Sequence, residues 1–285
     1  MHLYVGESQS QEQNTVENIG FLKKRRSFLL GAIGVLYGFK CYASGELGLI
    51  SLPKTISQAI NLAGRQRMLS QRGAKLYAQI LLNIRVDVAK KNINGTILEF
   101  EQQLSYLKSF LKGEKGQEKY LDLMGRQWGK YKAILAGQPS VAKLPEISEY
   151  SDAILGAANS LADLLQRSVG SKIGGIVNLS GRQRMLSQQL AKYLFFSANG
   201  YSEKNYTQDI IRARSEFSSA MNILKAAPEN TPETLSWLTL GDSQWSFYDQ
   251  FFSNIKKGTR LNDLAVASEN ILEVLEKLTF LYAKL

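Results

Sequence analysis

Histidine and cysteine are nearly absent from this chain of 285 residues. The sequence holds one histidine, His2, and one cysteine, Cys41, and both lie close to the N-terminus. Without imidazole or thiol groups, the rest of the chain cannot build a Cys- or His-based nucleophilic triad, a disulfide or most transition-metal sites. No paired-carboxylate, Gly-rich phosphate-binding or nucleophile-elbow pattern is present either. The sequence therefore predicts a protein that is not an enzyme and that holds no cofactor and no metal ion.

Proline is also scarce, and its scarcity favours helices. The five prolines leave long uninterrupted stretches, and an interior proline would break a helix. Within these stretches apolar residues recur three and four positions apart, as in Leu104, Leu107 and Leu111, which is typical of amphipathic helices. Hydrophobic residues make up 44% of the chain, enough for a real core. We therefore predict an all-α protein.

The N-terminal stretch resembles an export signal. Residues 23–26 are basic, residues 27–39 are apolar, and a small-residue site follows. The apolar run is shorter than the ~20 residues that a membrane-spanning helix needs. Residues 25–29 resemble the twin-arginine type of signal. We therefore predict that residues 1–43 form an export signal with a polar N-terminal extension, and that the protein is periplasmic. The alternative is an uncleaved N-terminal segment that tethers it to the inner membrane.

The charge of the chain favours anionic partners. The formal net charge is +10 at pH 7, and most of this excess lies beyond the export segment. An exported protein rarely meets nucleic acid, and no Lys/Arg cluster with interleaved aromatic residues is present. A small anion is therefore a better expectation than nucleic acid.

One segment of the sequence occurs twice. Residues 61–71 read NLAGRQRMLSQ and residues 178–188 read NLSGRQRMLSQ, an offset of 117 residues. The same offset, without any insertion, aligns Glu99-Phe100 with Glu216-Phe217, Gln127-Trp128 with Gln244-Trp245, and Ile154-Leu155 with Ile271-Leu272. Such agreement indicates a tandem duplication. We assign the two units to residues 52–168 and 169–285.

Each unit is expected to contain four helices. In the first unit we place them at residues 54–91, 95–112, 117–136 and 146–168. Short connections make consecutive helices antiparallel, so the sequence predicts two tandem antiparallel four-helix bundles. A turn near Gly170 would place the first helices of the two units side by side and parallel. A continuous helix there would instead give an end-to-end rod, and we favour the turn.

The repeated segment carries arginine within a stripe of small residues. On a helix Gly64, Arg67 and Gln71 share one face, and the second unit repeats the pattern. Two helices can approach closely along such a stripe, so the arginine would point at their seam. Two buried guanidinium groups facing each other repel, and a bound anion relieves both. The planar fork of a guanidinium suits a flat oxyanion. The alternative is that each arginine pairs with a glutamate of a neighbouring helix.

The preceding arginines, Arg65 and Arg182, lie on another side of the helix at ~100° per residue. We expect them to be solvated or salt-bridged surface charges.

The repeated segment resembles the nitrate/nitrite-sensing domain of the NarX-type sensor histidine kinases and of the PilJ-type (type IV pilus) methyl-accepting chemotaxis transducers. In the kinases of that family a Gly-x-x-Arg-Met core supplies one arginine from each subunit, and the two arginines hold one nitrate. The resemblance therefore implies ligand-binding roles for Gly64, Arg67, Met68, Gly181, Arg184 and Met185. It also implies that the duplication builds within one chain the two-fold site that the family makes by dimerisation.

The resemblance leaves several functions open. Family receptors carry transmembrane helices and a signalling module, and this sequence shows neither pattern. We therefore expect a sensor of nitrate or nitrite that passes its occupancy to a membrane receptor or transporter. The alternative is a ligand-free helical interaction module that docks on a membrane receptor or on a pilus or chemosensory partner. A homodimer with an intermolecular Arg67–Arg67 site is a further possibility.

Overall fold

The helices of the two repeats form two helical bundles, and in each bundle the long helices pack in a closed ring. The two rings meet along one interface, which we call the seam. A computed structural model describes residues 52–170, 172–201, 206–253 and 260–285, and residues 51–285 make one compact unit. Over this described part the chain is all-helical, as predicted. The predicted export signal at residues 1–43 lies outside the described residues. No described helix has the length and apolar character needed to cross a membrane.

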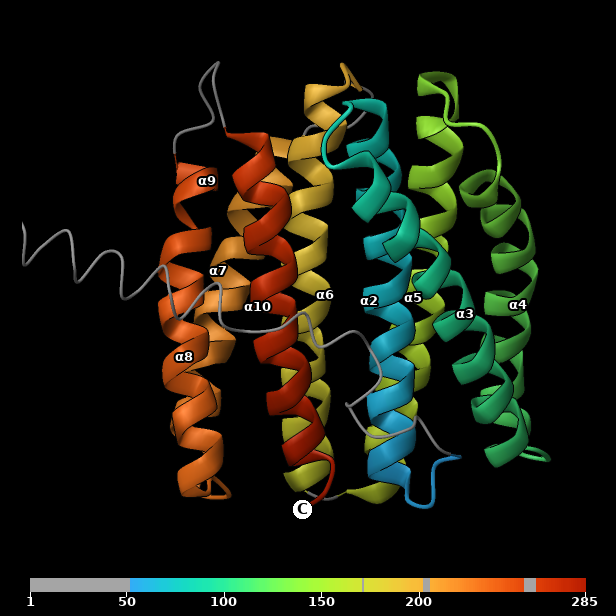
Figure 1. Ribbon diagram of the computed structural model, residues 1–285. Coiled ribbons are helices and arrows are strands. Elements are labelled where there is room, and N and C mark those ends of the chain that lie inside the picture. Colours follow the sequence, from blue (N-terminus) through green and yellow to red (C-terminus); the bar gives the residue numbers. More distant parts are fainter. Residues whose placement is uncertain (1–51, 171, 202–205, 254–259) are drawn as a thin grey trace, which may run out of the picture. The chain divides into compact units, whose positions relative to one another are not determined.

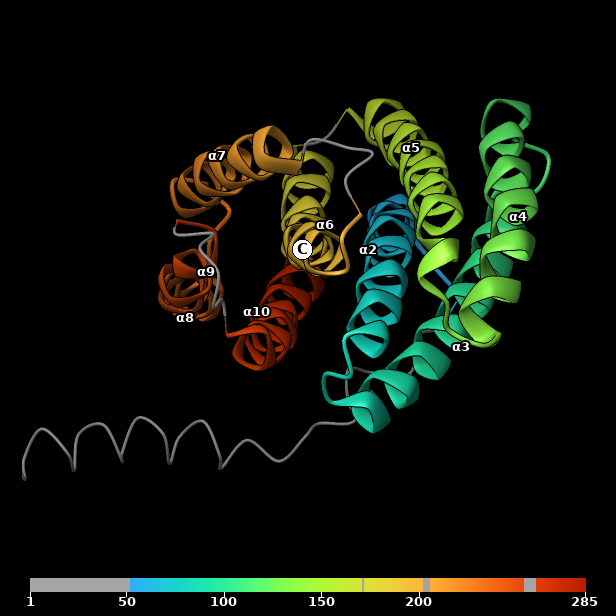
Figure 2. The same ribbon diagram turned by 90° about the horizontal axis from the view of Figure 1, so that it is seen from above.

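The first ring consists of four long helices from the first repeat. They are α2 (Ile56–Leu81), α3 (Val86–Phe110), α4 (Lys115–Ala136) and α5 (Leu144–Val169). Each helix packs against the next, and α5 closes the ring against α2 (Figures 1 and 2). Trp128 of α4 stacks on Phe100 of α3 with ring centroids 3.7 Å apart. The tryptophan therefore anchors the core, as a large aromatic ring at the centre of a bundle does.

The second ring repeats this arrangement. Its helices are α6 (Lys172–Ala198), α7 (Tyr206–Lys225), α8 (Pro232–Tyr248) with the short α9 (Gln250–Ser253), and α10 (Leu261–Tyr282). Trp245 stacks on Phe217 at 3.9 Å, the same contact 117 residues later. Because α2 and α6 pack against each other, the two rings meet directly (Figure 2). The residue limits 52–168 and 169–285 stay a prediction.

A tyrosine of each ring fixes the helix that carries the repeated motif. Tyr131 of α4 donates a hydrogen bond to the carbonyl oxygen of Ser70 in α2, at 2.7 Å. Tyr248 of α8 donates to the carbonyl of Ser187 in α6, at 2.6 Å. Both tyrosines are fully buried, so each phenol needs the partner that the helix backbone provides. These contacts hold α2 and α6 in equivalent positions in their rings.

The first helix ends earlier than the sequence analysis expected, at Leu81 rather than residue 91, and the second begins at Val86 rather than residue 95. The chain turns at Asn83 and Arg85, which both have positive φ angles. Ile84 is buried in this turn, and its carbonyl accepts a hydrogen bond from Gln79 Nε2. Burial of this apolar residue offsets the cost of the left-handed backbone. Gly95 lies instead within α3, where an added methyl group would meet nothing.

The expected turn between the repeats is present. Helix α5 ends at Val169, and Gly170 follows with a φ of 58°. This left-handed conformation is the one that glycine adopts readily at the end of a helix. Helix α6 then lies alongside α2 (Figure 1). Equivalent residues of the two helices meet, so α2 and α6 are parallel and in register.

Candidate anion site at the seam of the two repeats

Helices α2 and α6 come close together at Gly64 and Gly181. A methyl group added to Gly64 would lie 3.8 Å from the Cα atom of Gly181. It would also lie 3.1 Å from Nη2 of Arg67 and 3.3 Å from Nη2 of Arg184. The corresponding distances from Gly181 are 3.4 Å and 3.2 Å. The two guanidinium groups therefore gather at one point of the seam, in space that only glycine leaves open.

Each arginine reaches across the seam to the other repeat. Nη2 of Arg67 donates to Oδ1 of Asn178 at 2.8 Å, and Nη2 of Arg184 donates to Oδ1 of Asn61 at 2.8 Å. Asn61 and Asn178 are the first residues of the repeated motif, and the sequence analysis gave them no role. Their presence at the same place in both copies was the signal that could have found them. The exchange gives the site an approximate two-fold symmetry.

The symmetry breaks at the fourth helix of each ring. Nη1 of Arg67 donates to the amide oxygen of Asn159 at 2.9 Å. Nη1 of Arg184 donates instead to the carboxylate of Glu276 at 2.7 Å. Asn159 and Glu276 occupy equivalent positions, 117 residues apart. Arg184 therefore has a directly bonded counter-ion, and Arg67 has a neutral amide in its place.

Burial makes this difference electrostatically important. Both arginine side chains are fully buried. Burial, followed by repulsion from Arg184 and Arg182, lowers the pKa of Arg67 to about 9. Burial also lowers the pKa of Arg184, although the attraction of Glu276 opposes it. Nε of each guanidinium is buried and makes no hydrogen bond to any residue that the structure describes. Two adjacent buried cations with unused donors make a place where an anion would be stabilised.

A second buried layer, which the sequence analysis missed, crosses the same seam. Lys75 of α2 donates to the side chain of Gln188 in α6 at 2.8 Å and pairs with the carboxylate of Glu269 in α10. Lys192 of α6 mirrors it and donates to Gln71 at 2.9 Å, Ser151 at 3.0 Å and Asp152 at 2.7 Å. Both lysines are fully buried. Each lysine thus connects its own helix to two helices of the other ring, and the pair fixes the register of α2 against α6.

The outer arginines of the motif form ion pairs on the flanks of the seam. Arg65 lies between Glu99, at 2.8 Å, and Glu276, at 2.6 Å, with 13% of its side chain exposed. Arg182 pairs with Glu216, and 39% of its side chain is exposed. These are the salt-bridged positions that the sequence analysis expected, although Arg65 is more buried than a surface residue. The carboxylate of Glu276 therefore forms ion pairs with both Arg65 and Arg184.

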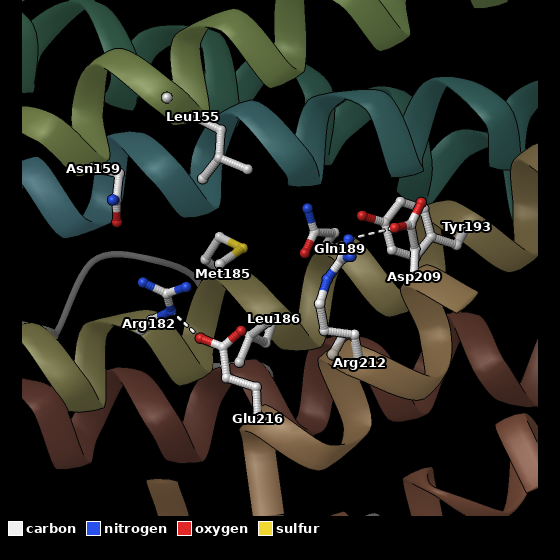
Figure 3. Close-up of a pocket in the computed structure, with 12 residues that line it drawn as sticks. Leu155, Asn159, Arg182, Met185, Leu186, Gln189, Tyr193, Asp209, Arg212 and Glu216 are labelled. Atoms are coloured by element: carbon white, nitrogen blue, oxygen red, sulfur yellow. Dashed lines mark hydrogen bonds and ion pairs between the residues drawn. The ribbon is translucent and has the colours of Figure 1, made fainter. Parts of the chain in front are cut away.

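A pocket of about 260 Å³ lies between α5, α6 and α7 (Figure 3). In Figure 3, Asn159 and Leu155 project from α5, and Arg182 and Met185 come from α6. Its wall also includes Gly156, Gln189, Tyr193, Asp209, Arg212 and Glu216. Asn159 lines the pocket and is also bonded to Arg67, so it separates the pocket from the buried guanidinium.

Four of the six predicted site residues meet at one point. Arg67, Arg184, Gly64 and Gly181 lie together at the seam. Met185 lines the pocket, and Met68 is buried in the first ring. The side chains that accept hydrogen bonds from the arginine pair belong to Asn61, Asn178, Asn159 and Glu276.

Comparison with known protein families gives one match. Residues 54–138, which run from just before α2 to just after α4, match the family described as the N-terminal domain of type IV pili methyl-accepting chemotaxis transducers. This part of the chain thus resembles a sensory or signalling-related helical domain. No curated protein and no solved structure matched the chain.

Proposed function

We propose that this protein binds one small planar oxyanion, nitrate or nitrite, at the seam between its two repeats and acts as a non-enzymatic sensor. The observation that carries the proposal is the convergence of Arg67 and Arg184. Both Nη2 atoms lie within 3.4 Å of the positions that methyl groups on Gly64 and Gly181 would take. Two like charges held this close, away from water, favour an anion between or beside them.

The chemistry of the site fits a small, flat and weakly hydrated anion. Guanidinium groups present planar, forked donors that match the oxygens of such an anion in pairs. The surrounding asparagines add amide groups without adding charge. One monovalent anion would offset the one guanidinium that lacks a bonded carboxylate. A more highly charged ligand would require more cations than the arginine pair offers.

The family match supports the sensory part of the proposal. It relates residues 54–138 to the N-terminal domain of chemotaxis transducers, and α2 lies within that range. The internal duplication extends the likeness to the second repeat, so the site of this chain would combine two copies of one sensory unit. We further propose that the protein works outside the cytoplasm and passes occupancy to a membrane receptor or transporter.

The ligand-free interaction module stays as the second candidate because one observation favours it. Arg184 already pairs with Glu276, and the amide oxygens of three asparagines occupy other donors of the pair. A seam bonded in this way can hold the two rings together without an anion. The two candidates differ in one measurable property, which is saturable binding of an anion.

Calorimetric titration of the full-length protein with nitrate, nitrite, chloride and acetate tests the proposal. We expect nitrate or nitrite to bind at one site per chain, and Arg67→Ala or Arg184→Ala to abolish binding. Arg67→Lys keeps the charge but loses the fork, so it should bind much more weakly. Arg126→Ala removes an exposed arginine of α4 and serves as the control. The absence of heat and of any shift in thermal unfolding with all four anions would refute the function and favour the interaction module.

A further inference from the structure

The two sides of the arginine pair offer an anion different surroundings. On the Arg184 side, the carboxylate of Glu276 accepts from Arg184 at 2.7 Å and from Arg65 at 2.6 Å. An anion approaching there would meet a negative charge that is already bonded to two arginines. Like charges in a buried site repel strongly. The Arg184 side is therefore closed to a further anion.

On the Arg67 side the acceptor is neutral and replaceable. Nη1 of Arg67 donates to Oδ1 of Asn159, which carries no charge. A bound anion adds a Coulomb attraction to the guanidinium that a neutral amide oxygen does not supply, and this attraction is stronger in a buried site than in water. An anion that takes the place of this amide oxygen therefore gains more than the arginine loses. It would also supply the negative charge that Glu276 supplies on the other side.

The side chain of Asn159 has room to move when an anion takes its place on Arg67. Its side chain lines the pocket between α5, α6 and α7, and its Nδ2 atom donates to Asp163 at 3.1 Å. Asp163 also accepts from Asn178 at 2.9 Å, which turns the oxygen of Asn178 toward Arg67. The pocket thus gives the amide of Asn159 room to rotate.

Two wall positions of the pocket differ between the repeats in size and charge. Two wall residues of the pocket, Gly156 and Gln189, correspond to Glu273 and Arg72 at the equivalent place of the other side. Arg72 is bonded there to Glu269 at 2.6 Å. At these two positions the Arg67 side therefore has smaller, neutral side chains where the Arg184 side has larger, charged ones.

We infer that the anion binds from the side of the pocket, in place of the Asn159 amide on Arg67, and that Asn159 and Glu276 decide the side and the number of anions bound. This inference rests on the proposed function. Glu276 acts as a built-in counter-ion for one arginine, and the exogenous oxyanion is the counter-ion for the other. Asn159 is the specificity-determining residue because it gives Arg67 a neutral acceptor in place of a directly bonded carboxylate.

The test compares a variant of each side in the full-length protein by nitrate calorimetry. Asn159→Asp keeps the size of the side chain and places a carboxylate on Arg67, so we expect the affinity to fall by about tenfold or more. Glu276→Gln removes the built-in counter-ion, so we expect tighter binding. Because the carboxylate introduced by Asn159→Asp would face Asp163, the double variant Asn159→Asp/Asp163→Asn removes that repulsion and should bind as weakly. Circular dichroism and thermal unfolding show that each variant is folded.

Each outcome separates this inference from the function on which it rests. Opposite changes of affinity in Asn159→Asp and Glu276→Gln support the inference. Unchanged affinity in both Asn159 variants, with nitrate still bound by the wild type, overturns the inference and leaves the function standing. Loss of binding in a folded Glu276→Gln variant also overturns it. Absence of binding in the wild type refutes the function, and this inference falls with it.

The role of the pocket has its own readout. Gly156 lines the pocket, and a methyl group added there would meet nothing, so the fold accepts a larger side chain. Gly156→Phe should slow the exchange between free and nitrate-bound protein by several-fold, as measured from NMR line shapes during the titration. Gly129→Phe is the control, because Gly129 is also open and lies on α4 away from the pocket. Equal exchange rates in the two variants would contradict entry from the pocket.

Discussion

The two halves of this molecule share one fold and differ in the charges that surround their central arginines. Arg67 and Arg184 sit in equivalent places, reach equivalent asparagines across the seam and press against equivalent glycines. The acceptor on the fourth helix differs, since it is the amide of Asn159 in one half and the carboxylate of Glu276 in the other. The backbone of a duplicated protein can thus remain symmetric while the buried charge becomes one-sided. In the function that we propose, a site built in this way would take one external anion rather than two.

Removal of the built-in counter-ion should have the largest effect on stability. Glu276→Gln leaves Arg184 and Arg65 without this carboxylate, and breaking a buried ion pair from one side costs about 3 kcal/mol or more. Asn159→Ala on the other side removes only a neutral acceptor and should cost about 1–3 kcal/mol. Urea unfolding of both variants without added anion measures the two costs. Equal costs would show that the charge of Glu276 is not what distinguishes the halves.

Adding a methyl group to either glycine at the seam should have the next largest effect on stability, and the effect should be the same in both halves. Gly64→Ala and Gly181→Ala each place a methyl group 3.1–3.4 Å from both Nη2 atoms, so the guanidinium groups must move. We expect each to lower the free energy of unfolding by about 2 kcal/mol, because overpacking outweighs the gain in helix propensity.

The control for the seam is Gly129→Ala. Its methyl group meets nothing on the exposed face of α4, so this change should raise stability by up to about 1 kcal/mol. Thermal unfolding in chloride-free buffer compares the three variants. A stabilising effect at Gly64 would mean that the helices are further apart than the structure shows.

Acidic pH should lower the free energy of unfolding, because Glu276 becomes protonated. Burial opposes ionisation of this carboxyl, but Arg184 and Arg65 outweigh it and hold its pKa below the usual 4.5. The folded state therefore binds this proton less readily than the unfolded state. The stabilisation is fully present above pH 4.5 and is lost as the pH falls through the lowered pKa, by up to about 1.4 kcal/mol per pH unit.

This acid effect has a matched comparison. The stability difference between wild type and Glu276→Gln should shrink between pH 7 and pH 3, as measured by urea unfolding at both values. A difference that is constant with pH would show that the pKa of Glu276 is the same in the folded and unfolded states.

The smallest effect on stability should come from giving position 72 of the first repeat the residue found at the equivalent position of the second repeat. Arg72 pairs with Glu269 at 2.6 Å, and its equivalent in the second repeat is Gln189. Arg72→Gln removes this part-exposed ion pair, while Glu269 keeps Lys75, so we expect a loss of about 1 kcal/mol or less. A larger loss would show that Arg72 also holds the seam, and a salt titration of the unfolding midpoint separates the two cases.

The general plan of the site could be predicted from the sequence, but its chemistry could not. The Gly-x-x-Arg spacing places a small residue and an arginine on one face of a helix, and its repetition predicts that the two meet. The asparagines that bind these arginines lie six residues before Arg67 and Arg184 along the chain, and each serves the arginine of the other helix. Sequence spacing on one helix carries no information about such an exchange. Lys75 and Lys192 were missed because a lysine is expected at the surface unless it is paired.

The sequence by itself determined the all-helical class, the repeated segments and the turn that sets two similar helices side by side. Scarce proline, apolar periodicity and the constant offset of 117 residues were sufficient, because each reports local preference or common origin. Only the tertiary structure decided which side chains meet across the seam. The end of the first helix at Leu81 also depended on tertiary packing, since burial of Ile84 overrode the local pattern. The placement of Asn159 beside Arg67 and of Glu276 beside Arg184 joins residues 92 positions apart. This tertiary contact decides which of the two arginines has a directly bonded carboxylate and which has a neutral amide.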